Sequence, residues 1–333
     1  MKNIKVGIIG MGRIGKIHLE NLSTRIDGVE VVAAVNPSKT GQEYATNFGV
    51  QTVSNNPDIL FENSEIDAIL ICSPSDTHAG YAIRAAEAGK AIFCEKPIDM
   101  SLARAKEVVV KVKENDVPMM VALNRRFDPD FAKVKLAVST GKIGQIQNLH
   151  IISRDPGPPS IDYIKQSGGL FKDMTIHDLD MARFIMGCEV TEIYATGSCM
   201  VDSAIGKVGD IDTATLVLRF ENGATATIEN SRKAVYGYDQ RLEVFGSKGM
   251  LQINNPLMSN VTNSDDYGFH ADVNLNFFID RYATSYLIEM QDFVNALIHK
   301  SPMPVDGNDG IKAIILADAA YASLNSNRPV EVE

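Results

Sequence analysis

Cysteine is scarce in this chain of 333 residues, and its spacing excludes the usual cysteine-based sites. The four cysteines, Cys72, Cys94, Cys188 and Cys199, form no C-x-x-C pair and have no histidine at zinc-finger spacing. This pattern predicts reduced, buried thiols in a cytoplasmic protein and no metal site.

Long apolar runs and a surplus of basic residues are also missing. No apolar run approaches the roughly 20 residues that cross a bilayer, and the chain leads at once into a glycine-rich unit with no signal peptide. The 32 Lys and Arg residues against 42 Asp and Glu residues give a net charge of −10, which argues against nucleic-acid binding. We expect a cytoplasmic protein with neither a membrane nor a nucleic-acid partner.

The first third of the chain alternates short apolar runs with amphipathic segments. This alternation predicts an α/β domain with a mostly parallel, doubly wound sheet. We expect a Rossmann dinucleotide-binding domain over residues 1–123. Its strands are predicted at 5–9, 29–35, 66–72, 91–94 and 118–123, and its clearest helices at 14–20, 79–88 and 102–114.

Residues 124–333 change character and predict an α+β domain with a large, mainly antiparallel open sheet. Several runs alternate apolar and polar residues, and Asn222-Gly223 between two of them is a strong hairpin signal. One face of such a sheet needs cover from helices or from another subunit. Strands are predicted at 146–153, 190–197, 213–220, 224–230 and 241–245, and helices at 171–186, 283–299 and 310–324.

A glycine-rich turn between the first strand and the first helix predicts a dinucleotide site. Its sequence is Gly10-Met11-Gly12-Arg13-Ile14-Gly15, a G-x-G-x-x-G pattern. Gly10 permits the tight turn, Gly12 lets the backbone approach a pyrophosphate, and Gly15 lets the helix pack on the strand. The helix N-terminus then presents free N–H groups to the phosphates.

The end of the second predicted strand bears on the choice of cofactor. An acidic residue there usually binds the adenosine ribose and repels a 2′-phosphate, but this chain has Asn36. Asparagine can bond the hydroxyl without the repulsion, and Ser38 and Lys39 could serve a phosphate. NAD is favoured as the cofactor, and NADP or dual use stays open. The alternative role of Asn36, as a turn residue before Pro37, is compatible with either cofactor.

Polar residues follow two further predicted strands of the first domain. Ser73, Pro74 and His78 lie after one strand, and Glu95 and Lys96 follow the next. Ligands bind at the carboxyl ends of strands in open parallel sheets, so these side chains are candidates for the cofactor or substrate. A surface ion pair between Glu95 and Lys96 is the alternative.

Asp173 and His177 are spaced four residues apart in a predicted helix, which puts both side chains on one face. A carboxylate beside an imidazole fixes its tautomer and raises its basicity, as suits a general base. An ordinary surface pair has the same spacing. Further candidates, with ion pairs or core edges as alternatives, are Arg125, Arg126, Asp155, Tyr236, Tyr238 and Tyr282.

Taken together, these motifs resemble the Gfo/Idh/MocA oxidoreductases over nearly the full chain. The resemblance rests on the glycine turn, Ser73-Pro74-x-x-x-His78, Glu95-Lys96-Pro97, Asn124-Arg125-Arg126-Phe127 and Asp173-x-x-x-His177, in this order. The segments 153–156, 167–169, 176–183 and 234–241 further resemble the inositol 2-dehydrogenases of that family.

The resemblance implies an NAD-dependent oxidation of myo-inositol to the 2-keto inosose in a homotetramer. Lys96 matches the family's catalytic lysine, and Asp173 with His177 its proton-handling pair. Together with these three, the polyol pocket would use Arg126, Asp155, Tyr236, Tyr238 and Tyr282. The cofactor would contact Gly10, Gly12, Arg13, Ile14, Gly15, Asn36, Ser73, Pro74, His78, Glu95 and Lys96.

Two alternatives remain open from the residues. The same machinery suits scyllo-inositol, D-chiro-inositol or an aldose such as glucose, because residue types do not reveal ring stereochemistry. A nicotinamide-bound sensor that has lost the reaction is the rival from another class. Retention of Lys96, Asp173 and His177 argues against the sensor.

Overall fold

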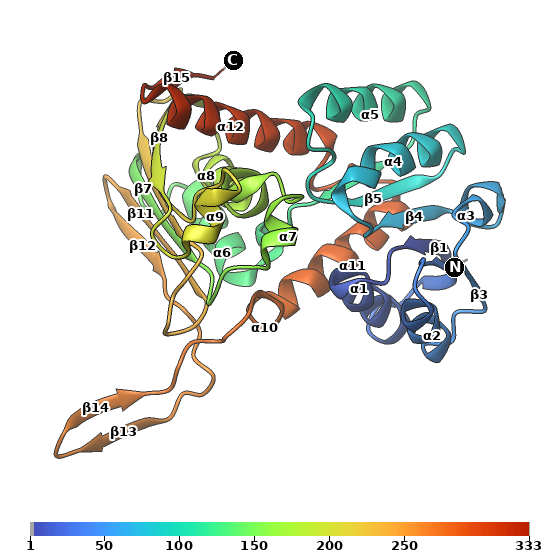
Figure 1. Ribbon diagram of the computed structural model, residues 1–333, viewed down its shortest axis with the longest axis horizontal. Coiled ribbons are helices and arrows are strands. Elements are labelled where there is room, and N and C mark those ends of the chain that lie inside the picture. Colours follow the sequence, from blue (N-terminus) through green and yellow to red (C-terminus); the bar gives the residue numbers. More distant parts are fainter. Residues whose placement is uncertain (1–2, 333) are drawn as a thin grey trace. The chain divides into compact units, whose positions relative to one another are not determined.

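A computed structural model describes residues 3–332 and divides them into two compact units (Figure 1). Unit 1 contains the chain up to Asn124 together with Ser285–Ile314, and unit 2 contains Arg125–Thr284 and the residues from Ile315 onward. The predicted domain boundary, after residue 123, lies one residue before the first of these divisions. The predicted second domain includes Ser285–Ile314, whereas in the structure this segment clusters with unit 1.

Unit 1 is built on a six-stranded sheet in the order β3-β2-β1-β4-β5-β6. All neighbouring strands pair in parallel, so the predicted doubly wound sheet is confirmed. The central strands β4 and β5 are short and almost wholly buried, as expected where helices cover both faces. The strands are β1 (Ile4–Ile9), β2 (Val29–Val35), β3 (Thr52–Ser54), β4 (Ala68–Ile71), β5 (Ala91–Glu95) and β6 (Met119–Ala122).

The segment Ser285–Ile314, which follows most of unit 2 in the sequence, completes the core of unit 1. Phe293 packs edge-on against Phe93 of β5 at 5.4 Å between ring centroids, and both side chains are buried. Periodicity identifies this segment as a helix but does not tell which sheet it covers, because that depends on tertiary packing. The helices of unit 1 are α1 (Arg13–Thr24), α2 (Lys39–Asn47), α3 (Asp58–Glu62), α4 (His78–Glu87), α5 (Leu102–Glu114), most of α11 (Ala283–His299) and the start of α12 (Gly307–Ser326).

Unit 2 is built on a seven-stranded sheet in the order β12-β11-β7-β10-β9-β8-β15. Its pairs are antiparallel except β7 with β10, which run in parallel, so the predicted mainly antiparallel sheet is confirmed. β9 alternates buried and exposed residues, which gives the sheet one core face and one open face. The strands are β7 (Ile146–Arg154), β8 (Val190–Ser198), β9 (Thr213–Phe220), β10 (Thr225–Ser231), β11 (Asp239–Gly246), β12 (Gly249–Ile253) and β15 (Val330–Glu331).

The helix predicted at 171–186 divides into two forms. Phe171–Thr175 is a π-helical turn, and α8 (Ile176–Met186) continues it as a regular helix. The Thr175 hydroxyl lies 2.6 Å from Asn230 Oδ1 and 3.4 Å from Leu170 O, a backbone oxygen at the start of the same turn. The other helices of unit 2 are α6 (Pro129–Ser139), α7 (Ile161–Ile164), α9 (Ser203–Lys207), α10 (Phe278–Arg281) and the end of α12.

A two-stranded hairpin, β13 (Thr262–Asp265) with β14 (Gly268–Ala271), extends away from the main sheet of unit 2 (Figure 1). The sequence analysis does not include it. The strand Thr-Asn-Ser-Asp is polar on both faces, so it lacks the alternation by which the other strands are recognised.

Candidate active site

The glycine turn of unit 1 places Gly10 and Gly15 where a side chain would disturb the backbone or the packing of α1. Gly10 has φ +99°, and a Cβ there would lie 2.5 Å from Cys72 O. A Cβ on Gly15 would lie only 1.9 Å from Gly10 O, so α1 can approach β1 only with glycine at that position. Arg13 and Ile14 form the first turn of α1.

Gly12 differs from its two neighbours, because a Cβ there would meet nothing within 4 Å. Gly12 is also the N-cap of α1, and no side chain caps the first amides of that helix. The turn therefore leaves open space in front of the first N–H groups of α1, at the positive end of the helix. This cradle fits the pyrophosphate of a dinucleotide.

Asn36, at the end of β2, ties the glycine turn to the following helix. Its Oδ1 accepts from Met11 N at 2.9 Å, and its Nδ2 donates to Ser38 Oγ at 2.8 Å. Ser38 Oγ in turn accepts from Gly41 N at the start of α2. Asn36 thus supports the loop as a turn residue while standing at the position that usually faces the adenosine ribose.

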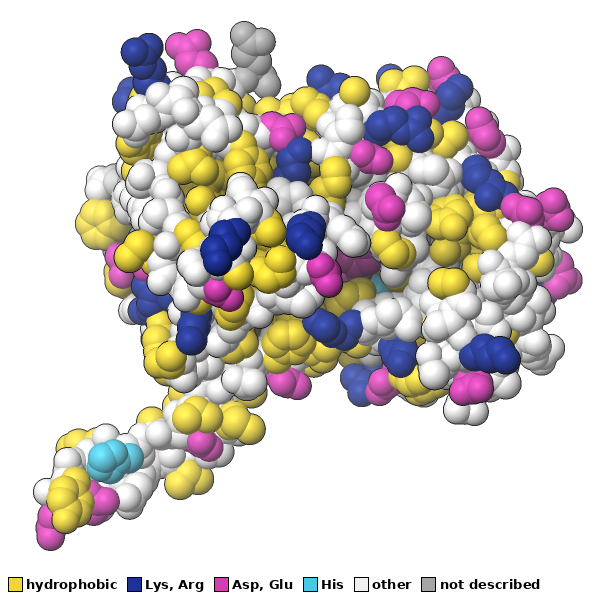
Figure 2. All heavy atoms as spheres, in the orientation of Figure 1, with side chains coloured by type: hydrophobic (Ala, Val, Ile, Leu, Met, Phe, Trp, Pro, Cys, Tyr) yellow, Lys and Arg dark blue, Asp and Glu magenta, His cyan; other side chains and the backbone are white. Residues whose placement is uncertain are grey.

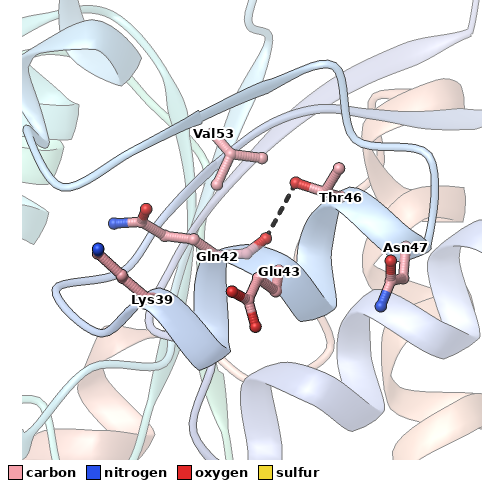
Figure 3. A pocket seen from close by; sticks show the side chains of 6 residues that line it. All are labelled: Lys39, Gln42, Glu43, Thr46, Asn47 and Val53. Carbon is pink, nitrogen blue, oxygen red and sulfur yellow. Dashed lines mark hydrogen bonds between the residues drawn. The ribbon is translucent and has the colours of Figure 1, made fainter.

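An open hollow lies beside α2 and β3 in unit 1 (Figure 3). It contains Lys39, which the sequence analysis weighs as a phosphate ligand, but none of the glycines or the strand-end residues. We therefore place the candidate chemistry elsewhere. Its lining is Lys39, Gln42, Glu43, Thr46, Asn47 and Val53.

His78 connects the two strand-end loops of unit 1. Its Nδ1 lies 2.8 Å from Pro97 O, its Nε2 lies 2.8 Å from Ser73 O, and the ring is buried. Pro74, between these loops, is exposed. His78 therefore orients the residues that follow β4 and β5.

Glu95 is the last residue of β5 and Lys96 follows it, and both are partly exposed. Glu95 Oε1 lies 2.9 Å from Nε2 of His18, a fully buried histidine of α1. This contact gives Glu95 an inward partner and fixes the strand end from which Lys96 projects.

In unit 2, the π-helical turn carries Asp173, and the first turn of α8 carries His177. Asp173 Oδ1 accepts from Tyr163 Oη at 2.9 Å, and Oδ2 accepts from Arg232 Nη1 at 3.0 Å. Both oxygens of the carboxylate are therefore held. The predicted spacing of four residues passes through a π-helical turn, a backbone form often found at functional sites.

Asp155 follows β7 and belongs to the same charged cluster. Burial raises its pKa to about 7, while Arg232 lowers it and Asp173 raises it. A carboxyl group with such a pKa changes charge close to neutral pH, which is typical of functional sites.

Arg125 and Asp178 form the inner support of this cluster. Arg125 Nη1 donates to Asp178 Oδ1 at 2.5 Å, and Asn230 Nδ2 donates to Asp178 Oδ2 at 2.8 Å. Tyr238 packs edge-on against Tyr282 at 6.1 Å, and burial raises the pKa of both phenols. The structure therefore gathers Asp155, Asp173, Tyr238 and Tyr282 around buried cations of unit 2.

Two predicted pocket residues make strong contacts of their own. Arg126 forms a two-bond clamp on Asp180 of α8, with donor–acceptor distances of 2.8 and 2.5 Å. Tyr236 donates to Asp239 Oδ2 at 2.7 Å and accepts from Arg154 Nη1 at 2.7 Å. These contacts hold the two side chains in fixed orientations.

Sequence reasoning missed Arg232, Asn230 and Tyr163. Arg232 and Asn230 lie at the end of β10, and their strand-end position in the second sheet is the only signal that pointed to them. Across residues 3–332, no group of three or more His, Cys, Asp or Glu side chains is placed to hold a metal ion. Over the same residues, no helix has the length and apolar character needed to span a membrane.

Comparison with known families covers both units. Residues 4–123 match the oxidoreductase family with an NAD-binding Rossmann fold, and residues 131–252 match the GFO/IDH/MocA C-terminal domain. Among curated proteins, myo-inositol 2-dehydrogenase of Thermotoga maritima is 46% identical over 330 residues, which are 99% of each chain.

Solved structures extend this likeness to three dimensions. A myo-inositol dehydrogenase from Corynebacterium glutamicum superposes with a TM-score of 0.94 at 37% identity, covering 99% of both chains. A scyllo-inositol dehydrogenase from Lactobacillus casei, solved with NAD(H) and scyllo-inositol, superposes with a TM-score of 0.92 at 31% identity, again covering 99% of both chains.

Proposed function

Because the chain belongs to the Gfo/Idh/MocA oxidoreductases, which carry an NAD-binding Rossmann domain, we propose that it oxidises a cyclic polyol with NAD. The proposed substrate is myo-inositol and the proposed product is 2-keto-myo-inositol. The choice of myo-inositol as substrate is supported by the similarity to the Thermotoga maritima enzyme over 99% of both chains.

The chemistry of unit 2 supports an uncharged substrate rich in hydroxyl groups. Carboxylates and phenols that accept and donate hydrogen bonds gather there, including Asp155, Asp173 and Tyr238. The buried cations Arg125 and Arg232 are each paired with a carboxylate of the chain, Asp178 and Asp173, which suits an uncharged substrate.

The cofactor is held by unit 1. Gly10, Gly12 and Gly15 would form the cradle, the first N–H groups of α1 would bind the pyrophosphate, and Asn36 would hold the ribose. When bound, NAD supplies the carbon that accepts a hydride from the polyol.

The proton is handled by residues of the chain. His177 accepts the proton of the reacting hydroxyl, and Asp173 stabilises the imidazolium that results. Lys96 stabilises the negative charge that develops on the same oxygen. Asp155, Arg126, Tyr236, Tyr238 and Tyr282 orient the ring.

The first experiment follows absorbance at 340 nm with NAD and NADP in parallel, against myo-inositol, scyllo-inositol, D-chiro-inositol and glucose. We expect rapid NAD reduction with myo-inositol. The Lactobacillus casei structure makes scyllo-inositol the strongest competitor, and activity only with another polyol would move the substrate while keeping the chemistry. No reduction with any of them would refute the proposal and favour the sensor.

The catalytic assignments are tested by Lys96→Met and His177→Gln. Loss of a proton-transfer or charge-stabilising group lowers turnover by about 10²–10⁴-fold, whereas NAD binding should stay within about threefold of wild type. Lys133→Met and His270→Gln, at exposed positions of unit 2, are the matched controls. Near-normal turnover in either test variant would refute its assigned role.

We also propose a homotetramer in the cytoplasm. Val217, Phe245 and Met250 are 43–48% exposed on the open face of the unit 2 sheet, and Figure 2 shows apolar side chains on the hairpin as well. A second subunit would cover such surfaces. Light scattering after size exclusion tests the oligomeric state.

The four unpaired cysteines suit a reducing compartment such as the cytoplasm.

A further inference from the structure

Arg232 and Asp155 leave the unit 2 sheet side by side. Their strands, β10 and β7, run in parallel with Ser231 opposite Arg154, so the next residue of each strand emerges at the same edge. Asp155 N donates to Ser231 O at 2.9 Å, and Ala234 N donates to Asp155 O at 2.6 Å. The backbone therefore fixes both residues before any side-chain contact is made.

The Arg232 side chain is directed at Asp173. Only 1% of Arg232 is exposed, although a guanidinium normally stays in contact with water. Among the described residues its side chain makes one hydrogen bond, from Nη1 to Asp173 Oδ2 at 3.0 Å. Its Nη2 lies 3.8 Å from Asp210 Oδ2, within ion-pair distance and beyond a hydrogen bond.

Arg232 also acts on Asp155. Burial raises the pKa of the Asp155 carboxyl, and the charge of Arg232 is the strongest effect that lowers it. One guanidinium thus acts on a carboxylate of the polyol site and on a carboxylate of the proton-handling pair. Tyr163, which holds the other oxygen of Asp173, carries no charge and cannot do the same.

We propose that Arg232 is a positioning residue for the oxidation, which fixes the Asp173 carboxylate beside His177 and couples its charge to that of Asp155. The inference rests on the proposed function, because it assigns Asp173 and Asp155 to the reaction. Arg232 supports kcat through Asp173, so this contribution disappears when the Asp173 charge is removed, whereas its effect on Asp155 is measured from the pH profile.

The test is a double-mutant cycle with Arg232→Gln and Asp173→Asn. A hydrogen bond between charged groups contributes enough to predict a fall of about 10- to 100-fold in kcat for Arg232→Gln in the wild-type background. In the Asp173→Asn background the same change should alter kcat less than about threefold, because the partner charge is already absent. Arg219→Gln, at an arginine that is 66% exposed on β9, is the matched control and should change nothing.

The pH profile gives a second readout. Arg232→Gln should shift the acid limb of kcat/KM to higher pH, because the cation that lowers the pKa of Asp155 is gone. Arg232→Lys keeps the charge and should restore that limb while kcat stays below wild type. The charged and titratable groups that act on Asp155 are Arg232, Asp173, Arg125, Asp178 and Tyr238.

The proposal is overturned if Arg232→Gln lowers kcat equally in both backgrounds, or if it leaves kcat and the pH profile unchanged. If Arg232→Gln shows no folded transition, Arg232→Lys is used in the same cycle. If the wild-type protein is inactive on every polyol, the proposed function is refuted, but the coupling between Arg232 and Asp155 can still be tested. The Asp155 titration is then followed without turnover, from ¹³C carboxyl resonances of aspartate-labelled protein, and an unshifted titration in Arg232→Gln refutes the coupling.

Discussion

Glu289 on α11 gives a sharp prediction, because it is a buried acid with no hydrogen-bond partner. Its side chain is fully buried in unit 1, and neither carboxyl oxygen finds a partner among the described residues. Burial raises its pKa well above the ordinary 4.5, and the charge of Glu95 raises it further. Glu95 in turn forms a hydrogen bond with His18. The charge of Glu289 also acts on the Cys72 thiol, whose pKa it raises.

The sign of the pH dependence follows from this raised pKa. Below pH 4.5 both the folded and the unfolded chain hold the proton, and the group does not change the free energy of unfolding. Above that pH the unfolded chain releases the proton while the folded chain keeps it. Each further pH unit then lowers the stability by about 1.4 kcal/mol, until the pKa of the folded state is reached.

Replacement of Glu289 by Gln removes this penalty while keeping the shape of the protonated acid. We expect Glu289→Gln to match the wild type near pH 5 and to gain stability relative to it as pH rises. The gain over two pH units is about 2.7 kcal/mol, if the folded protein keeps the proton over that range.

Urea unfolding of the NAD-free protein, followed by circular dichroism at several pH values, measures the difference. Glu87→Gln, an exposed residue of α4, is the control and should leave the pH dependence unchanged. A difference between Glu289→Gln and wild type that does not grow with pH would refute the reasoning, because it would mean that Glu289 ionises in the folded state as it does in the unfolded chain.

Four further substitutions test the proposed cofactor site of unit 1 and the proposed polyol site of unit 2. Asn36→Asp should raise the preference for NAD over NADP by about tenfold or more in kcat/KM, because a carboxylate repels the 2′-phosphate. Gly15→Ala should lose at least about 1–3 kcal/mol in urea unfolding, since its Cβ would lie 1.9 Å from Gly10 O, whereas Gly12→Ala should keep its stability and weaken NAD binding in calorimetry. Asp155→Asn should abolish the limb of kcat/KM near pH 7, and a retained limb would assign it to another group.

Local features of the fold could be predicted from the sequence. The strand, turn and helix around Gly10 form as expected, because backbone freedom and close approach are properties of the glycines themselves. The hairpin at Asn222-Gly223 also forms, and joins β9 to β10. In both cases the deciding interactions lie within a few residues of one another.

Features that depend on distant partners could not be predicted. The turn that carries Asp173 has a π-helical form, and its Thr175 bonds Asn230, which is 55 residues away in the sequence. The place of Arg232 depends on the parallel pairing of β10 with β7, across 77 residues. Spacing could therefore suggest Asp173 and His177, but not the groups that hold them.

The discontinuous chain path of unit 1 has a consequence for synthesis on the ribosome. Residues up to Asn124 emerge first, yet the face of Phe93 is covered only when Phe293 arrives. The hydrogen bond from Val121 N to Val305 O, at 3.2 Å, likewise forms only after Val305 has been translated. The six strands of the first sheet are therefore complete, but part of the sheet stays uncovered while residues 125–284 are translated, and we expect this protein to need protection from aggregation during that interval.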